Sequence, residues 1–201
     1  MSTSYSLDQY VHDLRTITAR ESDPITITER VAPLAKKFAQ TPGWLRPEHR
    51  ECDMEQGFGV HLLHEESNHD LAIFLISWLP NRGTTPHNHK TWAVVVGMEG
   101  HEQEVNWDRT DDGTKPGYAD LKRGGERVMT AGDVALCYPE DIHSVWNVGS
   151  GISMSLHTYG RHINYTGRSE FDPVHQLEKP FVVKVAADKP AKGPKARRHA
   201  S

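Results

Sequence analysis

Three histidines in two separate segments have the spacing of a metal site. His87 and His89 are two residues apart in the segment 85–89, and in an extended chain such residues project from the same face. Further along, the segment 132–147 contains a glycine, a proline, His143 and an asparagine, a pattern that favours a strand, a turn and a returning strand. We therefore predict that His87, His89 and His143 meet at one metal ion.

The residues after this pair supply no acidic ligand. Positions 91–93 are threonine, tryptophan and alanine, so the predicted site contains three neutral imidazoles. A divalent metal held in this way keeps its charge of +2 and has open coordination positions. Such a centre suits an anionic sulfur ligand together with O2, because the metal lowers the pKa of a bound thiol. Three histidines can equally hold Zn(II) with a water, and ligand type leaves both readings open.

A second group of polar residues alternates along one later segment. Ser155, His157 and Tyr159 face the same side of an extended strand. A serine, a histidine and a tyrosine in line can form a hydrogen-bond relay that ends in a phenol. We expect this relay to lie beside the open face of the metal.

The elements that must position these residues differ between the two parts of the chain. Residues 1–50 show the three- and four-residue apolar spacing of two amphipathic helices. Residues 57–185 contain short β-rich runs separated by turn residues, which favours a small barrel or sandwich. We predict one mainly β domain over residues 1–187, with the N-terminal helices packed outside. The basic tail at 188–201 is expected to be disordered.

Composition excludes several other classes of protein. The 201 residues are 36% hydrophobic and 25% charged, and the net charge of −4 gives no reason to expect a nucleic-acid partner. No run approaches the roughly 20 apolar residues of a membrane span, and the N-terminus has no secretory apolar region. The two cysteines, Cys52 and Cys137, fit a reducing compartment, so we expect a cytoplasmic protein without a membrane partner. Cys137 is expected in the core, and His101, His162 and His175 on the surface.

The two histidine segments resemble the two motifs of the cupin superfamily. Gly83, His87 and His89 match the first motif except for its glutamate, and the segment 132–147 with His143 matches the second. The resemblance covers roughly residues 57–185 and implies a small β-barrel of the jelly-roll type. Cupins have many functions, so this resemblance alone does not select a reaction.

The relay strand adds a resemblance to the cysteine dioxygenase family of thiol dioxygenases. In that family an iron(II) ion held by three histidines binds a thiolate, and both atoms of O2 are added to sulfur to give a sulfinic acid. The resemblance implies that His87, His89 and His143 bind Fe(II). It also implies that Ser155, His157 and Tyr159 form the catalytic outer triad; Trp78, Pro86 and residues 179–181 extend the match.

Two departures point away from cysteine as the substrate. The cysteine that mammalian enzymes crosslink to the tyrosine is replaced by Ala93, and His61 stands where they have a carboxylate-binding arginine. The chain is more similar to bacterial 3-mercaptopropionate dioxygenases, which share the step Tyr159-Gly160 and have a substrate-binding arginine at the position of Arg168. A guanidinium can hold a carboxylate in a bidentate manner. Arg161 is a second candidate for that role.

Several alternatives remain open at this level. A glutamine of the mercaptopropionate enzymes corresponds to Gly59 or Val60 here, which predicts a roomier or more apolar pocket. A bulkier thiol, such as mercaptosuccinate or ergothioneine, is therefore an alternative to 3-mercaptopropionate. The same reaction on cysteine is a further alternative. A zinc or manganese cupin that acts as an isomerase or hydrolase is another, and a non-enzymatic ligand-binding cupin is the last. Oligomeric state cannot be derived from these patterns.

Overall fold

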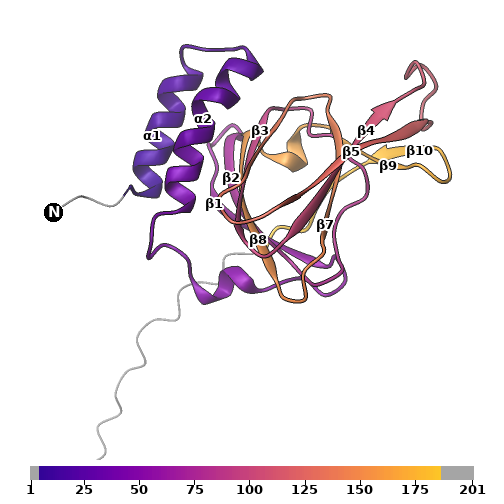
Figure 1. Ribbon diagram of the computed structural model, residues 1–201. Helices are drawn as coiled ribbons and strands as arrows, with labels where there is room; N and C mark the ends of the chain where they lie inside the picture. Colours follow the sequence, from indigo (N-terminus) through magenta and orange to yellow (C-terminus); the bar gives the residue numbers. More distant parts are fainter. Residues whose placement is uncertain (1–4, 187–201) are drawn as a thin grey trace, which may run out of the picture.

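The computed structural model describes residues 5–186, and the predicted tail at 188–201 lies outside the described residues. Two helices lie side by side against one face of a β-barrel, and a small hairpin projects at the opposite side (Figure 1). The elements are α1 (Leu7–Thr18), α2 (Pro24–Ala39), η1 (Pro47–Arg50), β1 (Phe58–His64), β2 (Asp70–Trp78), β3 (Ala93–Glu99), β4 (Glu102–Arg109), β5 (Leu121–Met129), β6 (Val134–Cys137), β7 (Ile142–Asn147), β8 (Ser153–Arg161), η2 (Ile163–Tyr165), β9 (Ser169–Asp172) and β10 (Leu177–Pro180).

Both helices begin at residues suited to that position. Ser6 caps α1 in a capping box with Gln9, which satisfies two backbone N–H groups that the first turn leaves free. Asp23 caps α2, and Pro24 occupies its first turn, where no N–H is needed. The Asp23-Pro24 pair thus begins the second helix.

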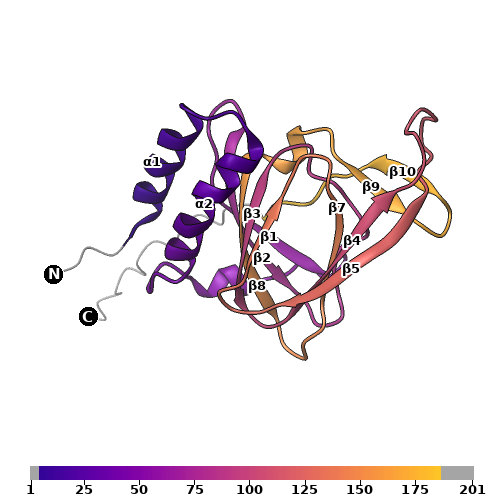
Figure 2. The same cartoon turned by 45° about the horizontal axis from the view of Figure 1, so that its top comes forward.

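The strands form two main sheets joined into a barrel (Figure 2). The larger sheet has the order β1-β2-β8-β3-β6, the smaller one β5-β4-β7, and β9 pairs with β10. Apolar side chains of both main sheets belong to one cluster, with Trp78 and Tyr159 from the larger sheet and Met129 and Val145 from the smaller. The mainly β barrel with two helices packed on its outside confirms the architecture predicted from sequence.

Both faces of the larger sheet are buried, and this arrangement decides what β8 can do. Leu156 belongs to the cluster between sheet and helices, and Thr158 bonds Tyr10 of α1 through their hydroxyls at 2.7 Å. The alternating residues of β8 face the barrel interior instead. A strand covered by helices on one face therefore has its other face available for a polar site within the barrel.

The prediction that His162 lies on the surface is wrong. His162, the residue before η2, is only 5% exposed, because the chain folds back there and places the His162 ring 5.0 Å from the ring of Phe74 between centroids. Cys137 is buried, as expected.

Among the described residues, no helix has both the length and the apolar character needed to cross a bilayer.

Candidate metal centre

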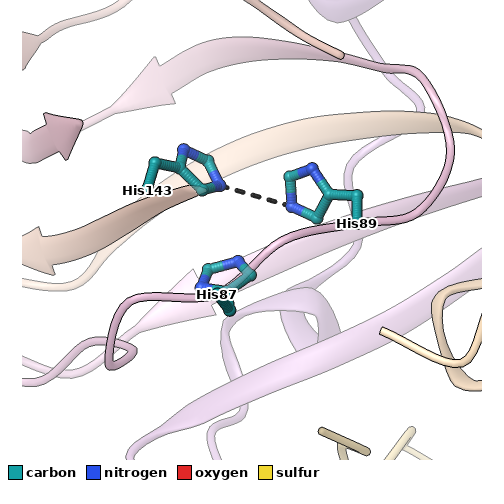
Figure 3. Close-up of side chains that lie close together, drawn as sticks. All are labelled: His87, His89 and His143. Carbon is teal, nitrogen blue, oxygen red and sulfur yellow. Dashed lines mark hydrogen bonds between the residues drawn. The ribbon is translucent and has the colours of Figure 1, made fainter. Parts of the chain in front are cut away.

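The three predicted histidines converge inside the barrel (Figure 3). A ligand atom of each lies within 4.8 Å of the others, and all three side chains are buried. His87 and His143 are brought opposite each other by reciprocal backbone hydrogen bonds of 2.8 and 3.0 Å. Four residues earlier, Gly83 permits the same segment to approach β7 closely, since a Cβ there would lie 2.0 Å from the carbonyl oxygen of Val145.

The Nδ1 atoms of His87 and His143 are hydrogen-bonded, and this orients the Nε2 atoms of the two rings toward a common point. His87 Nδ1 donates to the carbonyl oxygen of Thr85 at 2.9 Å, and His143 Nδ1 contacts Glu104 Oε1 at 2.8 Å. Metal-binding histidines usually donate their second nitrogen to a carbonyl or carboxylate in this way. The Nε2 atoms of His89 and His143 are 3.3 Å apart, within the range of about 3.0–3.4 Å expected for neighbouring ligands bound at about 2.1 Å. The donor set therefore fits a divalent metal.

Burial also keeps two of the rings in the ligand form. It lowers the pKa of His87 and His89 well below the ordinary value, and the neighbouring cationic groups act in the same direction. Neutral imidazole is the form that binds metal. Glu104 is the acidic partner: burial acts to raise its pKa, but contacts with His143 and Arg127 outweigh burial and lower it to about 2. The carboxylate is thus ionised and orients His143.

The three residues of the predicted relay are in hydrogen-bond contact along β8. Ser155 Oγ lies 2.8 Å from His157 Nε2, and His157 Nδ1 lies 2.9 Å from the Tyr159 hydroxyl. Trp78 Nε1 donates to Ser155 Oγ at 3.3 Å. The ring of Tyr159 also packs edge-on against His89 at 5.2 Å between centroids, so the relay ends beside the histidines.

Strand register explains why Tyr159 stands free of a covalent partner from β3. Ala93 is its direct neighbour on that strand, and Cys137 is the next across the sheet on β6. The methyl side chain of Ala93 cannot form the thioether that the family resemblance places at this position. Burial raises the pKa of the Cys137 thiol, which keeps it protonated and unreactive.

Arg168 reaches the same cavity with part of its guanidinium unpaired. The residue is 3% exposed, and within the described part of the chain its Nε and Nη2 atoms have no hydrogen-bond partner. The guanidinium carbon lies 4.1 Å from the centroid of the Phe181 ring, and burial lowers the pKa of Arg168 to about 10. At neutral pH it is a buried cation that forms no salt bridge with any residue between 5 and 186. Arg161, the second candidate, is instead on the surface and pairs with Asp70 at 3.1 Å.

The cavity that contains these groups has mostly apolar walls. Its polar lining residues are Thr84, His87, His89, His143, His157, Tyr159 and Arg168, and the apolar ones are Phe58, Val60, Ile76, Trp78, Val145, Ile163, Phe181 and Val183. On β1, Val60 faces the cavity, whereas His61 turns away and contacts the carbonyl oxygen of Glu51 at 3.0 Å. His61, which stands where the mammalian enzymes have a substrate-binding arginine, therefore does not line the cavity.

The described end of the chain forms part of the cavity wall. Phe181 and Val183 line the cavity and also a wider surface pocket beside it, which contains Glu170 and Lys184. Asn164 holds Val183 by two hydrogen bonds to its backbone, of 2.9 and 3.0 Å. Phe58 and Thr84 also line both, so the surface pocket adjoins the cavity of the histidines.

Glu104 is the residue of the site that the sequence patterns did not reveal. It lies next to Val145 in the pairing of β4 with β7, which sets its carboxylate beside His143. The only local signal is the alternation of Glu102 and Glu104 in a strand that also contains Val105. Two acids on one face of a predicted barrel strand are worth testing as partners of a buried histidine.

No family model matches the chain. Among solved structures it is similar to an uncharacterized conserved protein with a double-stranded β-helix domain from Klebsiella pneumoniae, at 13% identity over 65% of this chain and 93% of that one, with a TM-score of 0.47. It is also similar to an RmlC-like cupin protein from Desulfovibrio desulfuricans (19% identity, 60% and 97% covered, TM-score 0.42). An oxalate oxidase matches at 16% identity and a TM-score of 0.45, over 62% of this chain and 61% of the oxidase. These similarities concern the path of the backbone and do not assign a reaction.

Proposed function

We propose that this protein is an iron(II)-dependent thiol dioxygenase for a small mercapto-carboxylic acid, with 3-mercaptopropionate as the preferred candidate. The overall reaction adds both atoms of O2 to the thiol, so that RSH and O2 give the sulfinic acid RSO2H. The observation that carries the proposal is the buried guanidinium of Arg168, which lines the cavity of the three histidines and whose Nε and Nη2 atoms have no partner among residues 5–186. An unpaired buried donor is costly unless a ligand completes it.

The residues that line the cavity would each have a separate role in this reaction. His87, His89 and His143 would hold iron(II), which when bound supplies the open positions at which a thiol and O2 can react. Arg168 would bind the substrate carboxylate in a bidentate manner and so fix the direction of the thiol. Tyr159, positioned by its relay, would offer a hydrogen bond inside the cavity.

The cavity lining favours a particular kind of acid. Among its lining residues within the described chain there is one cation, Arg168, and no aspartate or glutamate. The ammonium group of cysteine would thus enter without an anionic partner, at a desolvation cost. A second carboxylate, as in mercaptosuccinate, would lack a second cation. Both arguments support an ω-thiol monocarboxylate.

A panel of thiols tests the proposal. Iron-loaded protein should consume O2 with 3-mercaptopropionate, and mass spectrometry after reaction in ¹⁸O2 should find two labelled oxygens in the sulfinate. Cysteine, cysteamine, mercaptosuccinate and ergothioneine complete the panel, and zinc-loaded protein is the control. Absence of thiol-dependent O2 uptake across the panel would favour a zinc or manganese cupin or a binding protein. A strong preference for cysteine would refute the assignment of the acid.

A further inference from the structure

The side chain of Phe181 stands between the cavity of the histidines and the surface pocket beside it. Four residues line both spaces, namely Phe58, Thr84, Phe181 and Val183. Phe58, Thr84 and Val183 are buried, whereas Phe181 is partly exposed. Its ring is therefore the part of the shared wall that reaches solvent as well as the cavity. The surface pocket has a volume of about 530 Å³, so removal of this ring would give the cavity much additional room.

The same ring covers the guanidinium of Arg168 and contacts a predicted metal ligand. The Cζ atom of Arg168 lies over the Phe181 ring, 4.1 Å from its centroid, and the His87 ring packs edge-on against it at 5.2 Å between centroids. Stacking on an aromatic face restrains a guanidinium, while its N–H groups, which lie in the plane, stay free for a carboxylate. Phe181 thus orients Arg168 without occupying the unpaired Nε and Nη2 donors.

Backbone hydrogen bonds hold the two residues in this arrangement. The N–H of Phe181 donates to the carbonyl oxygen of Arg168 at 3.0 Å, next to the pairing of Pro180 with Ser169 in β9 and β10. Ser169 is joined in turn to Asn88, which stands between the first two histidines, by hydrogen bonds of 2.9 and 3.1 Å. The backbone therefore fixes the place of Arg168 relative to the predicted metal ligands.

We propose that Phe181 is a specificity-determining residue that sets the length of the acid the cavity accepts. This role rests on the proposed function, in which Arg168 binds the substrate carboxylate. An acid bound there has its chain inside the cavity, so each further methylene needs space beyond it. The adjoining surface pocket offers that space, and the Phe181 ring blocks the way into it. A short ω-thiol acid is thus favoured over a long one.

Binding of thiol-free acids tests this role apart from catalysis. Propionate and hexanoate are titrated into metal-free, full-length protein labelled with ¹⁵N, and the amide shifts in NMR spectra give the dissociation constants. Neither acid can be oxidised at sulfur, and without a metal the carboxylate has Arg168 as its cationic partner in the cavity. The wild type should bind propionate at least about tenfold more tightly than hexanoate. Arg168→Met should lose the binding of both acids.

Phe181→Ala should reverse this preference. Loss of the stacking face should weaken propionate about fivefold, while hexanoate should gain about fourfold in affinity for each methylene that enters the opened pocket. General loss of structure would weaken both acids alike. Phe181→Leu removes the aromatic face and part of the volume, so it should show the same change in smaller size and replaces the first variant if that fails to fold. Val182→Ala is the matched control, because Val182 is 70% exposed and lines the surface pocket but not the cavity.

The possible results separate this role from the proposed function. An unchanged ratio of the two affinities in a folded Phe181 variant would overturn the proposal, as would the same reversal in Val182→Ala. Propionate that fails to bind the wild type, or binds Arg168→Met equally well, would refute the carboxylate site, and with it both the proposed function and this role of Phe181. A ratio that reverses as expected in a protein that oxidises no thiol would support the role of Phe181 and refute the proposed function alone.

Discussion

Replacing Glu102 by glutamine should change how the stability of the protein depends on pH. The carboxyl is buried, and its pKa is raised from 4.5 to about 7. The unfolded chain therefore loses this proton at a lower pH than the folded protein does. Between these two values the folded state binds more protons, so the free energy of unfolding falls as pH rises.

The size of the effect follows from the two pKa values. At about 1.36 kcal/mol for each pKa unit, ionising Glu102 removes about 3 kcal/mol of stability between pH 4.5 and 7, and no more above pH 7. Glutamine has nearly the same shape and never ionises. The variant's stability relative to the wild type should therefore increase by about 3 kcal/mol across this range and then level off.

Denaturant unfolding of metal-free protein at pH 5, 6, 7 and 8, followed by tryptophan fluorescence, measures this difference. Comparing the two proteins at each pH cancels the titration of the other groups, including the 13 histidines. A difference between Glu102→Gln and the wild type that stays constant from pH 5 to 8 would refute the reasoning, because it would mean that Glu102 ionises as readily in the folded protein as in water.

Four further substitutions test the site. Arg168→Met should raise KM for 3-mercaptopropionate about 100-fold, since an unpaired carboxylate is costly to bury; Arg161→Gln is the matched control, and equal kinetics in both would remove Arg168 from the pocket. Tyr159→Phe should lower kcat about 100-fold at unchanged iron content, and an unaltered rate would contradict a donor role. His143→Ala should lose its metal by elemental analysis, whereas full retention would exclude it as a ligand. Glu104→Gln should weaken metal affinity by about 10- to 100-fold in chelator competition; equal affinity would show that His143 needs no orienting partner.

Short-range periodicity predicted much of the interior. The two-residue spacing of His87 and His89, and of His157 and Tyr159, sets which face of an extended segment each side chain occupies. The structure follows those faces. Neither spacing specifies the ion or the substrate, so the roles of these residues stay predictions. The fold, with helices over one face of the barrel, followed from the change of periodicity after residue 50.

The contacts that could not be predicted from the sequence depend on the register between strands that are far apart in the chain. Glu104 meets His143 only because β4 pairs with β7 in one register, and no local pattern sets that pairing. A one-residue shift on β1 likewise exchanges Val60 for His61 at the cavity, since successive side chains point to opposite faces. His162 was misplaced because a short turn, not a strand, carries it back against Phe74.

Because Phe181 and Val183 form part of the wall, the cavity is completed only after the last part of the domain has been synthesised. Synthesis proceeds from the N-terminus, so the three histidines and Arg168 leave the ribosome before the segment that encloses them. Until that segment docks on Asn164, the histidines lack part of their cover. A metal ion can thus reach them during this interval without passing through the finished barrel.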